Sequence, residues 1–140
     1  MDEQAKRMLL DRVTQIPIVK SLRFDFQEMS EGFCRLIMPH EKRFHGIYES
    51  VHGGLLMTLA DSAACFAIMT HTGPDELLTT TDMNIRFLAP CLSDAHAHAR
   101  VIKLGRTLCP VAVDLFDKAG LQVAVAQVTY MRLDKMPKRS

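Results

Sequence analysis

The sequence predicts an α+β fold in which a six-stranded antiparallel sheet is wrapped around one long central helix. Two strand-like segments come first, an apolar helical segment follows at about residues 53–71, and four more strand-like segments complete the chain. The chain has 140 residues, 48% of them hydrophobic, and a domain of about this length buries roughly 68–70% of its unfolded surface. We therefore expect one domain over residues 1–140, with a short helix within residues 1–16 and a frayed tail over residues 134–140.

The first elements are predicted to be a surface helix and a hairpin. Residues 3–13 carry apolar side chains at helical spacing with charges between them, and the pattern ends before Pro17. Apolar and polar residues alternate over residues 22–28, residues 30–32 supply a turn, and the alternation resumes over residues 33–38. The apolar residues of the first predicted strand are Leu22, Phe24 and Phe26.

The central helix is predicted from its length and from its uninterrupted apolar character. Residues 39–51 have no period and contain proline and glycine, so we expect a loop there. The next segment is apolar around most of its circumference up to Gly73-Pro74, which is typical of a buried helix of about five turns. Its small residues, which would let a sheet pack closely, are Ala60, Ala63, Ala64 and Ala67.

After Pro74 the alternation of side chains predicts four strands joined by turns at the spacing of antiparallel hairpins. The four segments are residues 77–89, 95–104, 107–116 and 121–133. In the second segment one face carries His96, His98 and Arg100, and the opposite face carries only small apolar residues. Such a face, here Ala95, Ala97, Ala99 and Val101, suits a closely packed helix.

Composition and charge exclude several classes of protein. Lys and Arg number 17 against 16 Asp and Glu, which provides no long-range field to hold nucleic acid or an acidic membrane. The longest apolar stretch, Leu55 to Met69, is interrupted by polar residues, and we expect it to be too short to span a bilayer. The four cysteines form no C-x-x-C pair, and the N-terminus lacks the features of a signal peptide. These features predict a cytoplasmic protein with reduced thiols and without a metal site.

The strongest chemical signal is Asp61, a carboxylate in the middle of the apolar helix. Removing a carboxylate from water costs several kcal/mol unless it is paired. Thr58, Asp61, Ser62 and Cys65 lie at helical spacing and could instead form an ordinary solvated stripe. This stripe is narrow and lacks Lys, Arg and Glu, which favours a functional role for Asp61.

A second signal, His52-Gly53-Gly54, directly precedes this helix. Paired glycines permit close backbone approach, and the first amides of a helix are unpaired donors at the positive end of its dipole. This arrangement suits an anion or a developing oxyanion, although the same residues could form only a tight turn into the helix.

Taken together, these motifs resemble the small hotdog-fold acyl-CoA thioesterases of the phenylacetate-degradation type. The resemblance runs from about Ile16 to Leu133. The matching positions are His52-Gly53-Gly54, Leu59, Asp61-Ser62-Ala63, residues 79–90, Gly105-Arg106-Thr107 and residues 127–132.

The resemblance implies hydrolysis of an acyl-CoA thioester at an interface between two subunits. Asp61 would activate water or attack the acyl carbon, and the Gly53 amide would polarise the thioester carbonyl. Thr80 would lie near the attacking water, and His52 would orient the loop. The implied substrate-binding residues are Gly54, His45, Thr81 and Cys65.

The resemblance also implies no cofactor, since coenzyme A is part of the substrate, and self-association as a homodimer or a dimer of dimers. The chain departs from the family at Gly46, where an amide side chain is common, and at Glu49, where glycine is common. This departure motivates an alternative, a non-catalytic module that binds acyl-CoA or another acyl ligand, and His45 or His52 could replace the missing amide.

Three other features give weaker signals. His96 and His98 share a strand face, but no further metal ligand is indicated. Cys65 lies one turn beyond Asp61 and could be a nucleophile, although a free cysteine without a basic neighbour is mostly an inert core residue. The basic residues of the C-terminal tail could meet the phosphates of coenzyme A or simply be solvated.

Overall fold

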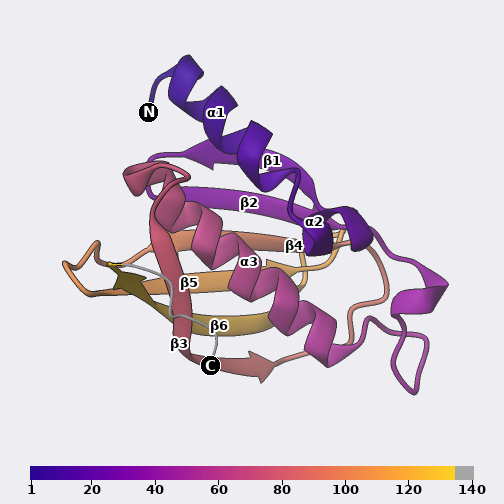
Figure 1. Cartoon of the computed structure of the whole chain (residues 1–140). Helices are drawn as coiled ribbons and strands as arrows, with labels where there is room; N and C mark the ends of the chain where they lie inside the picture. The colour runs from indigo at the N-terminus through magenta and orange to yellow at the C-terminus, as the bar shows by residue number, and fades with distance from the viewer. Residues whose placement is uncertain (135–140) are drawn as a thin grey trace, which may run out of the picture.

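The computed structural model describes residues 1–134 and confirms the predicted architecture, a six-stranded antiparallel sheet around one long helix (Figure 1). The strand order across the sheet is β1-β2-β4-β5-β6-β3. The elements in chain order are α1 (Glu3–Val13), α2 (Pro17–Ser21), β1 (Asp25–Ser30), β2 (Phe33–Met38), η1 (Lys42–Phe44), α3 (Gly53–Thr72), β3 (Leu77–Phe87), β4 (Ala95–Val101), β5 (Leu108–Phe116) and β6 (Gln122–Leu133). The predicted tail beyond residue 134 lies outside the described residues.

Small side chains let α3 lie close to the sheet, as predicted from the alanines. The four alanines of α3 are fully buried, and so are the three alanines of β4 that face the helix. Helix α3 packs against β2, β4 and β5 in the middle of the sheet. Because alanine extends only one carbon from the backbone, the two elements can approach closely without a cavity between them.

The N-terminal region contains one more helix than the sequence suggested. Helix α1 is capped by Asp2, whose carboxylate accepts a hydrogen bond from the Ala5 N–H at 2.7 Å, and α1 packs against α3. The short helix α2 begins at Pro17, a residue suited to the first turn of a helix. The prediction that Pro17 only ends a helix was therefore incomplete.

The first strand begins at Asp25 and not at residue 22, so its predicted start was wrong. Phe24 is buried, as the alternation indicated, but it precedes the strand. The register with β2 shifts between Phe26 and Glu28, which marks a β-bulge. The bulge turns Met29 into the core, whereas strict alternation from Phe26 would place Glu28 there.

Helix α3 spans Gly53–Thr72, close to the predicted residues 53–71, and is longer than the apolar stretch Leu55 to Met69 used in the membrane argument. It has 20 residues, and by length and composition it is long and apolar enough to cross a membrane. The expectation that this segment is too short to span a bilayer was therefore wrong. Half of an 18-residue stretch of this helix is buried inside the fold, which is typical of a core helix.

Candidate functional site

The Asp61 carboxylate lies half-buried on α3 and is held through one of its oxygens. Its Oδ1 accepts hydrogen bonds from the Thr80 hydroxyl at 2.7 Å and from the Tyr130 hydroxyl at 2.9 Å. The other oxygen, Oδ2, has no hydrogen-bond partner among residues 1–134. Asp61 is therefore oriented by the protein while keeping one oxygen for a water molecule or a substrate.

A β-bulge decides which threonine reaches Asp61. Thr80 on β3 lies opposite Tyr130 on β6, so the two side chains project from the same face of the sheet. The register shifts between Thr80 and Asp82, which leaves Thr81 as the extra residue of the bulge. Strict alternation along the rest of β3 would turn Thr81 towards the helix in place of Thr80.

Tyr130 is a site residue that sequence reasoning missed. Alternation along β6 puts it on the inner face with Val128 and Ala126, and among the buried residues of this face it is the one that carries a polar group. A buried tyrosine hydroxyl usually finds a hydrogen-bond partner. The signal was therefore present in the sequence, but it did not identify Asp61 as that partner.

The start of α3 is shaped by its two glycines. The ring of His52 caps the helix, because its Nδ1 accepts a hydrogen bond from the Gly54 N–H at 2.9 Å. A Cβ atom on Gly54 would lie 2.9 Å from His52 Cε1, and one on Gly53 would lie 3.2 Å from Cζ of Phe87. The Gly53 N–H has no hydrogen-bond partner among the described residues. It is thus a free donor at the positive end of the helix dipole.

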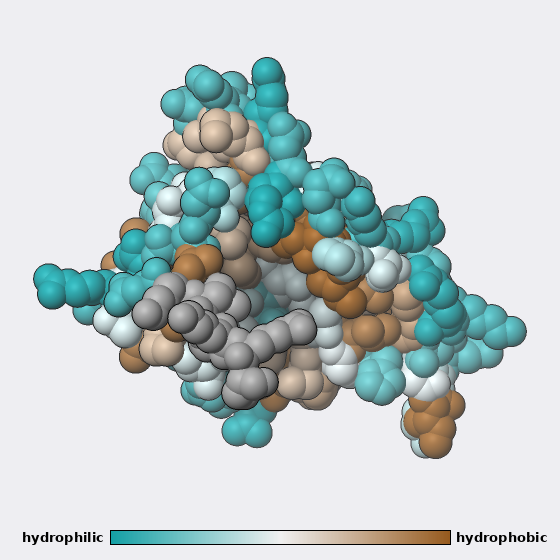
Figure 2. Space-filling model, in the orientation of Figure 1, coloured by the Kyte–Doolittle hydropathy of each residue, from teal (hydrophilic) through white to brown (hydrophobic). Residues whose placement is uncertain are grey.

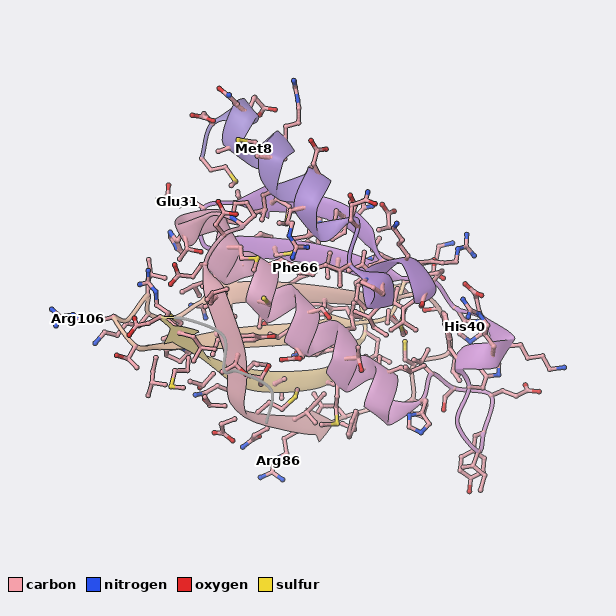
Figure 3. All side chains as sticks on the ribbon, viewed as in Figure 1. Met8, Glu31, His40, Phe66, Arg86 and Arg106 are labelled. Carbon is pink, nitrogen blue, oxygen red and sulfur yellow. The ribbon has the colours of Figure 1, made fainter. Side chains whose placement is uncertain are left out.

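Two of the predicted substrate-binding residues do not contact Asp61. The His45 ring lies against His40, with their Nε2 atoms 2.9 Å apart, at the end of the molecule where α3 begins (Figure 3). The Thr81 hydroxyl donates to the backbone oxygen of Thr129 at 3.2 Å. Both side chains therefore make contacts within their own loop or sheet.

Cys65 lies next to the carboxylate but is not an activated nucleophile. Burial raises the pKa of its thiol to about 12, a hydrogen bond with Tyr130 partly offsets this rise, and the charge of Asp61 adds to it. Only a thiolate attacks efficiently. The surroundings of Cys65 therefore favour the interpretation that it is an inert core residue.

The loop before α3 carries the two positions that depart from the family pattern. Gly46 and Glu49 are both exposed, and between them Ile47 is 91% and Tyr48 75% exposed. Figure 2 shows this loop projecting from the molecule with a hydrophobic tip, and further hydrophobic surface over the N-terminal half of α3. Neither departing residue contributes a hydrogen bond to Asp61.

The histidines of β4 lie on the outer face of the sheet, away from Asp61. The His98 ring packs against Phe116, with ring centroids 4.9 Å apart. Burial, followed by the charge of Arg35, lowers the pKa of His98. Within residues 1–134 no group of three or more His, Cys, Asp or Glu side chains could hold a metal ion.

Comparisons with known proteins agree with this fold. The model of the thioesterase superfamily matches residues 48–124. Human acyl-coenzyme A thioesterase 13 is 37% identical over 85 residues, which cover 59% of each chain. The PaaI protein from the phenylacetic acid degradation operon of E. coli has a TM-score of 0.85 and 22% identity, covering 95% of this chain and 96% of that one. A thioesterase family protein from Silicibacter pomeroyi has a TM-score of 0.84 and 22% identity, covering 92% and 98%.

These structural neighbours confirm the predicted hotdog fold. The matched family segment contains the glycines at the start of α3, Asp61 and Thr80. Because this segment spans more than half of the 140 residues, the chain belongs to the thioesterase superfamily.

Proposed function

We propose that this protein hydrolyses an acyl-CoA thioester to a free acid and coenzyme A. The observation that carries the proposal is the Asp61 carboxylate, which is oriented through Oδ1 while Oδ2 stays free. The likeness to human acyl-coenzyme A thioesterase 13 supports coenzyme A as the thiol of the substrate. Coenzyme A enters as part of the substrate, and the reaction needs no cofactor.

The chemistry requires a nucleophile and a group that stabilises negative charge on the carbonyl oxygen. Asp61 takes a proton from water, whose oxygen then bonds to the acyl carbon, or it attacks that carbon itself and water cleaves the resulting anhydride. In either route the carbon–sulfur bond breaks, and the sulfur leaves as the thiol after taking up a proton. The free N–H of Gly53 supplies the donor for the carbonyl oxygen.

The spacing along α3 supports a site shared by two copies of the chain. Gly53 and Asp61 are eight residues apart on one helix, which corresponds to about 12 Å along its axis. One carbonyl group that contacts both residues directly needs each of them within about 3 Å. We therefore assign the Gly53 donor of each site to one copy and Asp61 to the other.

The edge of the sheet supports the same assembly. Strand β3 ends the strand order and, among the described strands, pairs only with β6, so its other edge is free to pair (Figure 1). Pairing of two copies along β3 would extend the sheet, and Phe87, which is 51% exposed on this strand, would lie near the junction. We propose a homodimer, with further association into a dimer of dimers.

The first experiment tests the activity itself. The purified protein is given a panel of aryl-acetyl, medium-chain and branched acyl-CoAs, and the released thiol is measured. We expect turnover of at least one substrate, and we expect Asp61→Asn to reduce kcat by about 10²–10⁴-fold. Full activity of the variant, or no turnover of any substrate by the wild type, contradicts the proposal. Tight binding of an acyl-CoA that stays intact supports the non-catalytic alternative.

The second experiment tests the shared site by mixing two inactive variants. Asp61→Asn removes the carboxylate. Gly53→Pro removes the N–H at the first position of α3, where the backbone of proline is well tolerated, and its Cβ atom would lie 3.2 Å from Cζ of Phe87, the exposed end of a side chain that can shift. A mixed dimer with a shared site has one intact site, so random mixing restores about a quarter of the wild-type activity. No restoration in a mixture shown to exchange subunits, or a fully active monomer, contradicts the shared site.

A further inference from the structure

We propose that Tyr130 is a positioning residue for Asp61. Together with Thr80 it fixes the carboxylate through Oδ1 and so selects Oδ2 as the oxygen that acts on the thioester. The inference rests on the proposed function, because it concerns how the reacting carboxylate is held. Its basis is the set of contacts around the Tyr130 hydroxyl.

The hydroxyl of Tyr130 has two oxygen acceptors, and both belong to Asp61, while the Cys65 thiol also lies close enough to interact with it. It lies 2.9 Å from Oδ1 and 3.0 Å from the backbone oxygen of Asp61. A tyrosine hydroxyl has a single proton, so it donates to one of these oxygens at a time. In either case the ring of Tyr130 ties the middle of α3 to β6.

Burial makes the contact from Tyr130 more persistent than the contact from Thr80. Tyr130 is only 6% exposed, whereas Thr80 is exposed and its hydroxyl competes with water for Oδ1. A hydrogen bond removed from water is not exchanged for one to solvent, so its loss has a larger effect. Tyr130 is therefore the stronger of the two constraints on the carboxylate.

The Tyr130 hydroxyl stays a donor at every pH relevant to thioester hydrolysis. Burial raises its pKa far above the usual range, and the nearby Cys65 thiol and Asp61 carboxylate raise it further. It does not form a phenolate that could attack the substrate or remove a proton. Its role is thus confined to holding Asp61.

A carboxylate rotates about its Cβ–Cγ bond unless it is held. Two donors on the same oxygen allow one orientation, and this orientation presents Oδ2 to the reacting atoms without a competing protein contact. Reactions of this kind depend on the angle as well as the distance of the attacking group. Loss of the Tyr130 hydroxyl should reduce the rate of the chemical step more than substrate binding.

The test uses Tyr130→Phe, which removes only the hydroxyl and keeps the buried ring. We expect kcat to fall about 10–100-fold, the effect of losing a hydrogen bond to a charged group, while KM stays nearly unchanged. Thr70→Val is the matched control. Like Tyr130, Thr70 is buried, and it lies on α3. Its hydroxyl donates to the Ala67 oxygen at 2.6 Å and accepts from the Gly32 N–H at 2.7 Å.

We expect Thr70→Val to lower the melting temperature about as much as Tyr130→Phe and to leave kcat unchanged. If Tyr130→Phe keeps the wild-type kcat, or if both variants lose kcat in proportion to stability, the inference is wrong. If the wild type hydrolyses no acyl-CoA, the proposed function fails, and crystal structures of the wild type and Tyr130→Phe then decide the inference. A rotated or disordered Asp61 carboxylate in the variant supports it, and an unchanged carboxylate overturns it.

Discussion

Replacing Thr80 by valine and Tyr130 by phenylalanine, singly and together, measures how the two donors share Asp61. Both substitutions preserve shape and remove one hydroxyl each. A hydrogen bond to a charged group contributes about 1.5–3 kcal/mol. Since Thr80 is exposed and water can replace it, we expect about 1.5 kcal/mol for Thr80→Val, and we expect about 3 kcal/mol for Tyr130→Phe because Tyr130 is buried.

These energies correspond to losses of about 10-fold and 100-fold in kcat/KM. With one donor left, Asp61 Oδ1 is still held, but with neither donor the carboxylate rotates freely. The double variant should therefore lose more than the product of the single losses, with a coupling free energy of about 1 kcal/mol.

The assay is the release of free thiol from the best acyl-CoA substrate, measured for all four proteins at the same pH. Thermal unfolding of each protein shows whether the fold is retained. A double variant whose loss equals the product of the single losses would show that the two hydroxyls act independently. A larger loss for Thr80→Val than for Tyr130→Phe would refute the argument from burial.

Three further predictions concern the framework of the site. Replacing His52 by alanine removes the helix cap of α3 and should lower the free energy of unfolding, measured in urea, by about 1 kcal/mol. His52→Asn should keep most of the wild-type stability, because asparagine caps helices well. Equal losses of stability in the two variants would contradict the capping role. Ala97→Leu, at a fully buried position under α3, should lower the free energy of unfolding by about 1–3 kcal/mol through overpacking. Ala112→Leu, on the outer face of the sheet, should lower it far less. Similar urea midpoints for the two variants would argue against close packing of the helix on the sheet. Because burial raises the pKa of Cys65 from 9.0 to about 12, the thiol of the unfolded chain ionises first, and the free energy of unfolding should fall as the pH rises from about 9 towards 12. Cys65→Ala should make the free energy of unfolding, measured by urea titration, depend less on pH in this range. An unchanged dependence on pH would contradict the raised pKa of Cys65.

The helix, the hairpins and the alanine faces could be predicted because they depend on local periodicity. An alanine face on one strand and an alanine stripe on one helix are complementary, so even their packing could be inferred before the fold was known. Asp61 also stood out locally, because a short carboxylate within an apolar helix is unusual.

The remaining features depend on contacts between residues far apart in the chain. Periodicity does not show that Tyr130 meets Asp61, because that contact requires the packing of α3 against β6. A bulge leaves no clear pattern in a run of three threonines, so alternation alone could not choose among them. The choice of Thr80 came from the family resemblance, and it is Thr80 that contacts Asp61.

The bulge at Thr81 means that strand register, as well as residue identity, sets the chemistry at Asp61. Deleting this one residue would leave Thr80 opposite Tyr130, whereas pairing of the full strand without the bulge would move every side chain between Leu77 and Thr80 to the opposite face of β3. Without the bulge, the hydroxyl beside the carboxylate would come from Thr81 in place of Thr80, without any substitution. A relative that lacks the bulge residue can therefore present the same hydroxyl to its aspartate, so alignments of this family need to be anchored on strand register as well as on matching letters.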